Sequence, residues 1–208
     1  MNKIITLLLL VLTFSMSAQD QLAKEVLDKL SSTTESYKNI SIDFEFIFEN
    51  KSQEIRETQN GKIILENDNF KLELDNQIIF NDGETQWIYN SDINELQIIE
   101  HDSEDEMMNP DKLFKIYEKD YKYTYIGAES KNGERLHVID LFPEESNSFM
   151  KITLYINVIK NQLEKLILFD KNGGTYSYII NTFKSNSLTK PLDFNIDQYG
   201  DVEIIDLR

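Results

Sequence analysis

Apolar and polar side chains alternate along many short stretches of this 208-residue chain, and such alternation favours a fold built mainly from a sheet. The pattern is clearest over residues 40–49, where one alternating set is entirely apolar: Ile40, Ile42, Phe44, Phe46 and Phe48. Successive strand residues point to opposite sides of a sheet, so this stretch predicts a strand with its phenylalanines on one face. A sheet with one apolar face must be covered by another element.

Further strands are expected, separated by short polar turns. Asp82-Gly83 and Lys131-Asn132-Gly133 supply the residues that tight hairpins favour. The expected strands cover residues 55–66, 70–75, 78–80, 85–89, 96–99, 121–125, 136–142, 149–158, 163–169 and 175–183, with a short pair near Phe194 and over 202–205. Strands joined in this way favour an antiparallel meander.

Two helices are expected beside the strands. Leu22, Val26, Leu27 and Leu30 recur at helical spacing, which predicts an amphipathic helix over residues 19–30. Composition changes between residues 100 and 120, where Asn109 and Pro110 suit the cap and first position of a second helix. The pattern therefore predicts an α+β fold, with a large curved antiparallel sheet and two helices on one of its faces.

Residues 1–18 have the pattern of a secretory signal peptide that is cleaved after Ala18. Lys3 provides a positive start, and the apolar core that follows is shorter than the roughly 20 residues of a membrane span, so cleavage is favoured over an uncleaved anchor. The chain has 0 cysteines, which excludes a lipidated cysteine and disulfides. We expect an exported periplasmic protein with a single domain over residues 19–208.

The formal net charge of −16 argues against nucleic acid as a partner, because the basic residues form no cluster that could displace counterions from phosphates. The same charge would repel anionic lipid head groups, although it can equally serve solubility alone.

Residues for catalysis are few. The chain has 2 histidines, no cysteine and no serine in a Gly-x-Ser-x-Gly turn, so we expect no enzyme and no cofactor. His101 and His137 are interpreted as ordinary residues. The acidic residues 102–106 lack the glycine and spacing of a calcium loop, and we expect no metal site.

The hairpin over residues 70–89 carries Asp82, Gly83, Trp87 and Tyr89. This segment resembles the periplasmic outer-membrane lipoprotein carrier family (LolA-like proteins), in which an Asp-Gly hairpin is followed by Trp and then Tyr. Similar stretches near residues 152–157, 176–181, 190–194 and 202–206 extend the resemblance over nearly the whole mature chain. It implies an unclosed antiparallel β half-barrel, a strongly curved sheet with helices covering its concave apolar face.

The resemblance also implies a function: a periplasmic carrier that shields lipoprotein acyl chains in a hydrophobic cavity and transfers lipoproteins from the inner to the outer membrane. Its expected partners are acylated lipoproteins, an inner-membrane lipoprotein-releasing transporter and an outer-membrane acceptor, and we expect a monomer. The residues expected to line the cavity are Phe44, Phe46, Phe48, Leu72, Leu74 and Trp87. Those expected in the lid are Met107, Met108, Leu113, Phe114 and Tyr117.

The chain departs from the family pattern where Lys71 and Leu72 replace an arginine and a tryptophan. Lys71 and nearby Asn67 are the candidate latch for the lid, and a lysine lacks the planar fork of arginine. From the residues alone, a filled core and a lipid cavity stay equally open. The alternatives in function are a binding protein for free lipid or another hydrophobic molecule, a scaffold and, more distantly, a hydrolase.

Overall fold

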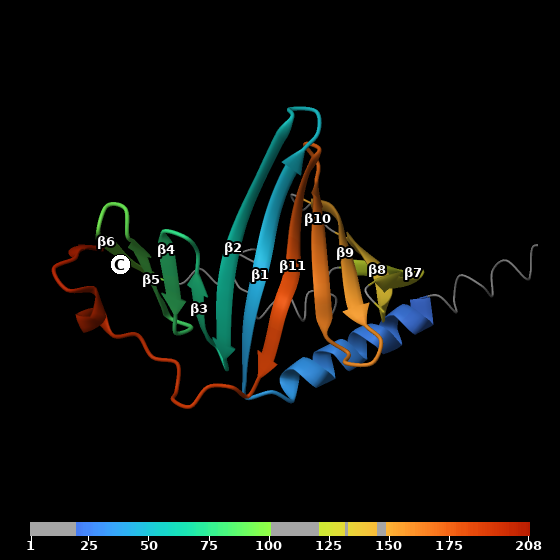
Figure 1. Cartoon of the computed structure of the whole chain (residues 1–208), viewed down its shortest axis with the longest axis horizontal. Helices are drawn as coiled ribbons and strands as arrows, with labels where there is room; N and C mark the ends of the chain where they lie inside the picture. Colours follow the sequence, from blue (N-terminus) through green and yellow to red (C-terminus); the bar gives the residue numbers. More distant parts are fainter. Residues whose placement is uncertain (1–19, 101–120, 132, 145–148) are drawn as a thin grey trace, which may run out of the picture.

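The computed structural model describes residues 20–100, 121–131, 133–144 and 149–208. Within these residues the chain forms an N-terminal helix over residues 20–35 and a single 12-stranded sheet (Figure 1). The strands are β1 (Asn39–Asn50), β2 (Ile55–Glu66), β3 (Asn69–Glu73), β4 (Gln77–Asn81), β5 (Thr85–Asn90), β6 (Glu95–Glu100), β7 (Tyr121–Lys131), β8 (Glu134–Pro143), β9 (Phe149–Asn157), β10 (Leu163–Asp170), β11 (Gly174–Ser185) and β12 (Glu203–Asp206).

The strand order is β12-β6-β5-β4-β3-β2-β1-β11-β10-β9-β8-β7, so β12 and β7 form the two edges of an unclosed sheet. The expected antiparallel pairing is confirmed from β6 to β7. The expected meander, in which each strand pairs with the next one in the sequence, is wrong at two places. Strand β11 pairs with β1, and β12 runs parallel to β6. The arrangement is consistent with a curved half-barrel.

The main core lies on one side of this sheet, which we call the inner face: the side that carries Ile42, Phe44 and their cross-strand partners. The register aligns apolar side chains across it from strand to strand. One such row consists of Ile139 of β8, Leu154 of β9, Leu166 of β10, Tyr178 of β11 and Phe46 of β1. This period-2 apolar surface is the physical reason that the strands associate.

The N-terminal helix packs Ala23, Val26, Leu27 and Leu30 into the same core, whereas Leu22 is exposed. It continues beyond its expected end at Leu30 to residue 35. In this last stretch the hydroxyl groups of Ser32 and Thr34 donate to backbone carbonyls three and four residues back. The second expected helix lies outside the described residues. Among the residues described, no helix has the length and apolarity to span a bilayer.

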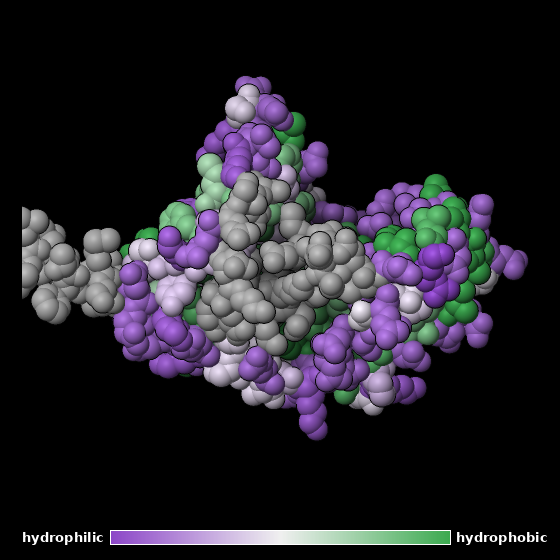
Figure 2. All heavy atoms as spheres, turned by 180° about the vertical axis from the view of Figure 1, so that it is seen from behind, coloured by the Kyte–Doolittle hydropathy of each residue, from purple (hydrophilic) through white to green (hydrophobic). Residues whose placement is uncertain are grey.

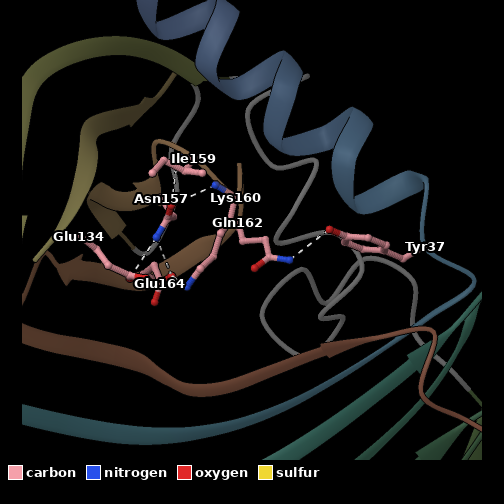
Figure 3. Close-up of polar contacts among 7 residues, drawn as sticks. All are labelled: Tyr37, Glu134, Asn157, Ile159, Lys160, Gln162 and Glu164. Atoms are coloured by element: carbon pink, nitrogen blue, oxygen red, sulfur yellow. Dashed lines mark hydrogen bonds and ion pairs between the residues drawn. The ribbon is translucent and has the colours of Figure 1, made fainter. Parts of the chain in front are cut away.

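The C-terminal end of this helix is tied to the turn between β9 and β10 (Figure 3). Gln162 donates through Nε2 to the Tyr37 hydroxyl at 3.1 Å. Asn157 organises the turn itself, because its Oδ1 accepts from the backbone N–H groups of Ile159 and Lys160, both at 3.0 Å. These bonds fix where the helix crosses the sheet.

Bulges bend several strands. The register skips one residue in each of β7, β9, β10 and β11: Ile126, Met150, Glu164 and Asn181. An extra residue on one strand increases local bending and twist, which favours a curved sheet. It also explains why the apolar Ile126 and Met150 are more than half exposed.

The chain ends in what we call the C-terminal strap, residues 186–208, which runs from the end of β11 to the far edge of the sheet (Figure 1, red). Asn39 Oδ1 accepts from the backbone of Ser187 at 2.8 Å, and Glu66 Oε2 accepts from the backbone of Leu192 at 2.6 Å. The strand expected near Phe194 is wrong: this stretch is irregular and leads into a 3-10 helix, η2 (Ile196–Tyr199). The strap then pairs through β12 with β6.

Candidate functional site

The centre of the inner face is formed by aromatic side chains of β1 and β11. Phe46 stacks on Tyr176 with ring centroids 6.3 Å apart and contacts Tyr178 at 5.1 Å. Phe48 contacts Tyr176 at 5.0 Å. Phe46, Phe48 and both tyrosines are only partly buried, so their rings still present apolar area that another molecule could cover.

Phe44, in contrast, is closed in. It faces Gly61 of β2, and a Cβ built on that glycine would lie 2.4 Å from the phenyl ring. The absence of a side chain on Gly61 therefore lets the far end of the Phe44 ring approach the backbone of β2 closely. Phe44 is 8% exposed and belongs to the buried part of the main core.

Leu72 and Leu74 extend this apolar surface towards β3, where both pack on the main core while staying partly exposed. The structure thus confirms that Phe44, Phe46, Phe48, Leu72 and Leu74 share one side of the sheet. Their contact with lipid stays a prediction.

Trp87 is the exception: the prediction that it lines the same apolar face as Phe44, Phe46 and Phe48 is wrong. The register pairs Trp87 with Phe80 and Ile98, on the opposite side of the sheet, which we call the outer face. Its ring stacks on Phe194 of the strap at 4.7 Å. We call Phe80, Trp87, Phe194 and Tyr199 the outer cluster.

The candidate latch is also displaced. Lys71 pairs with Phe80 in the register, which places it on the outer face, and its Nζ lies 2.7 Å from Glu73 Oε1. Asn67 is exposed in the turn after β2, where its backbone has φ +54°. Lys71 therefore cannot act as a latch over the inner face. The expected lid, Met107, Met108, Leu113, Phe114 and Tyr117, lies outside the described residues.

Sequence reasoning missed the polar groups that interrupt the inner face. On β7 and β8, the Tyr125 hydroxyl lies 2.9 Å from His137 Nδ1. Burial, and then Arg135 and Lys29, lower the pKa of His137 and favour the neutral ring. Burial raises the pKa of Tyr178, which keeps that hydroxyl neutral as well. In the sequence, His137 is followed by Val138 and Tyr178 by Ile179, which indicates alternation along a strand. The sequence does not indicate which face of the sheet His137 and Tyr178 occupy.

A hollow with a polar, charged lining lies away from the inner-face aromatic residues. It lies beside β5, β6 and β12, has a volume of about 560 Å³, and is lined by Glu84, Thr85, Glu100, Asp206 and Arg208. Arg208 donates to Asp206 and lowers the pKa of that carboxyl to about 2. Such a charged lining suits water better than an acyl chain.

On the face seen in Figure 2, most coloured residues are hydrophilic, and apolar residues gather at the end that holds β3–β6. No group of three or more His, Cys, Asp or Glu side chains that could hold a metal occurs among the residues described. The apolar area of the inner face is instead supplied by the partly buried rings of Phe46, Phe48, Tyr176 and Tyr178.

The family model described as "Outer membrane lipoprotein carrier protein LolA" matches residues 35–197. Among curated proteins, no sequence matches the chain.

Solved structures with low sequence identity share the fold. An uncharacterized conserved protein from Thermus thermophilus is similar with a TM-score of 0.59 and 13% identity, over 88% of this chain and 98% of that chain. The Mycobacterium tuberculosis lipoprotein LppX is similar with a TM-score of 0.50 and 9% identity, over 85% of this chain and 100% of that chain. MucB is similar with a TM-score of 0.50 and 14% identity, over 88% of this chain and 65% of that chain.

Proposed function

The chain belongs to the outer membrane lipoprotein carrier (LolA) family, and on that premise we propose that it is a periplasmic carrier of acylated lipoproteins. In this proposal the protein is exported, loses its leader after Ala18 and acts as a single domain over residues 19–208. It performs no catalysis. It receives lipoproteins from an inner-membrane releasing transporter and passes them to an outer-membrane acceptor.

One observation carries the proposal: the large apolar side chains at the centre of the inner face are not fully buried by the sheet. Phe46 and Phe48 of β1, Leu72 of β3 and Leu74, which directly follows β3, share that face and stay partly exposed. A fully packed core would bury such residues, because each contributes on the order of 1.5–3 kcal/mol when it leaves water.

The acyl chains of a lipoprotein need to be shielded from water. An acyl chain of about 16 carbons costs on the order of 12 kcal/mol to expose to water, at roughly 0.8 kcal/mol per methylene. A concave apolar face covered by helices, as the family resemblance implies, would remove that cost. The N-terminal helix covers part of the face through Val26, Leu27 and Leu30.

Loading is tested by two substitutions on one strand. Phe46 points to the inner face, while its neighbour Ile47 pairs with Ser177 on the outer face. Phe46→Asp and Ile47→Asp therefore introduce the same charge at adjacent positions on opposite faces. The full chain, with its leader, is expressed, purified from the periplasm, and analysed by mass spectrometry for bound lipid and bound protein.

We expect acylated lipoprotein to copurify with the parent chain and with Ile47→Asp, and loading to fall at least tenfold in Phe46→Asp, because a desolvated charge opposes acyl binding. Circular dichroism checks that each variant is folded. Equal loading of a folded Phe46→Asp variant would contradict the assignment of the face. Free lipid without protein would instead favour a binding protein for free lipid, and neither would favour a scaffold.

A further inference from the structure

Asn81 is a polar side chain set into the apolar inner face. It ends β4, lies opposite Phe70 of β3 and Gln86 of β5, and is 1% exposed. Ile79, two residues earlier on the same strand, belongs to the main core. The Asn81 amide thus lies at one end of the surface that Leu72 and Ile79 form.

The turn that follows fixes how this amide is oriented. Asn81 Oδ1 accepts a hydrogen bond from the backbone N–H of Gly83 at 2.7 Å. Gly83 has φ +92°, which favours glycine and sets the direction of that N–H group. Rotating the amide by half a turn would place its NH₂ group against the Gly83 N–H, so the network assigns the nitrogen to the other side.

Among the residues that the structure describes, that nitrogen, the buried Asn81 Nδ2, has no hydrogen-bond acceptor. A buried donor without an acceptor is costly, because it has given up water without replacement. The turn uses only the Oδ1 atom of Asn81. It therefore accounts for a side-chain oxygen at this position, but not for the buried Nδ2 donor.

We propose that Asn81 Nδ2 donates a hydrogen bond to the carbonyl oxygen of an ester- or amide-linked acyl chain bound on the inner face. This inference rests on the proposed function and adds the polar contact that orients the cargo. A carbonyl oxygen is an acceptor without a donor, which matches an N–H group that lacks an acceptor. The attached hydrocarbon would then follow the partly exposed Leu72 and Leu74 along the apolar surface. Because the nitrogen is already desolvated, the bond forms without stripping water from the protein.

The experiment compares ligands that differ only at the carbonyl. One pair is 1-palmitoylglycerol and its ether analogue 1-O-hexadecylglycerol; a second is a synthetic palmitoylated lipopeptide and its alkyl counterpart. Affinities for the full chain are measured by displacement of a fluorescent fatty-acid probe. We expect the carbonyl-containing member of a pair to bind about tenfold more tightly than its analogue. A preference confined to the lipopeptide pair would identify lipoprotein as the source of the carbonyl, and a preference confined to the glyceride pair would identify free lipid.

Asn81→Asp keeps an oxygen for the Gly83 turn and removes the amide donor, and Asn81→Ala removes the whole amide group. Whichever variant is folded should bind both members of a pair equally, whereas Asn60→Asp, an exposed substitution on the outer face, should keep the preference. Equal binding of carbonyl and ether ligands by the parent chain, or an unchanged preference in a folded Asn81 variant, would overturn the inference alone. No binding of any ligand would overturn the proposed function, and the inference with it.

Discussion

The main core on the inner face and the outer cluster on the opposite side bury apolar residues in different ways. The main core is largely aliphatic, extends over most strands, and contains fully buried side chains such as Ile139, Ile152 and Leu154. The outer cluster is aromatic and local. Its members Trp87 and Phe194 are only partly buried and lie 4.7 Å apart.

The difference shows why β4 and β5 have apolar residues at consecutive positions. Ile79 and Ile88 face the main core, while Phe80 and Trp87 face the strap. Strand β1 has no strap across its outer face, and there it carries Asp43, Glu45 and Glu49 instead. A strand without clear alternation is thus covered on both sides.

The largest effect should come from the main core. Leu154→Ala removes a side chain that is 1% exposed and aligned with Ile139 and Leu166, and should destabilise the protein by about 2–5 kcal/mol. Urea denaturation followed by circular dichroism measures this loss. Ile159→Ala, at a position 87% exposed, is the control and should change stability by less than about 0.5 kcal/mol. Equal effects of both substitutions would contradict the assignment of the core.

The outer cluster should respond less and locally. Phe194→Ala removes the ring that stacks on Trp87 and should cost about 1–3 kcal/mol. Trp87 is the single tryptophan of the chain, so its fluorescence reports on this cluster alone. We expect a red shift in emission, while circular dichroism still shows a folded sheet.

The exposed Ile196→Ala, also in the strap, is the matched control and should leave the emission unchanged. A different result would contradict this separation. If the emission of folded Phe194→Ala is unshifted, and fluorescence and circular dichroism show one coincident unfolding transition at a lower urea concentration than in the parent chain, the two regions form a single cooperative unit.

The smallest effect concerns pH and should separate the regions again. Burial and nearby Arg135 and Lys29 hold the pKa of His137 below 6.5, so the unfolded chain takes up this proton first as the pH falls. The neutral histidine therefore stabilises the fold above pH 6.5, and this contribution is lost as the pH falls below that value.

His137→Gln should flatten the pH dependence of urea stability in this window, and Trp87 emission of the folded protein should not change there. A pH profile that is identical in parent and variant would show that His137 does not contribute.

Sequence reasoning succeeded where one face of a strand is polar. Residues 40–49 gave the correct face for Phe44, Phe46 and Phe48, because their neighbours are mostly acids and a serine. It failed for Trp87, because Ile78-Ile79-Phe80 and Trp87-Ile88-Tyr89 are apolar throughout and period 2 then selects no face. Only the register with β3 resolves them.

Contacts between residues far apart in the sequence were the second feature that the sequence could not predict. Residues 190–194 were expected in a closing strand, yet Leu192 is held by Glu66 and Phe194 by Trp87, far away in sequence. The parallel pairing of Glu203 with Glu95 is likewise absent from any local pattern. The buried amide of Asn81 was hidden for the same reason, because it was visible only as part of a turn.

The parallel pairing of β12 with β6 also constrains the order in which the protein is built. A ribosome releases β6 before β7–β11 and β12, so the edge of β6 that β12 covers stays open until residues 203–206 have been made. An open edge can pair with strands of other chains. Synthesis of β12 is therefore the step that blocks this edge, and a chain that lacks this strand would be expected to aggregate before it lost its core.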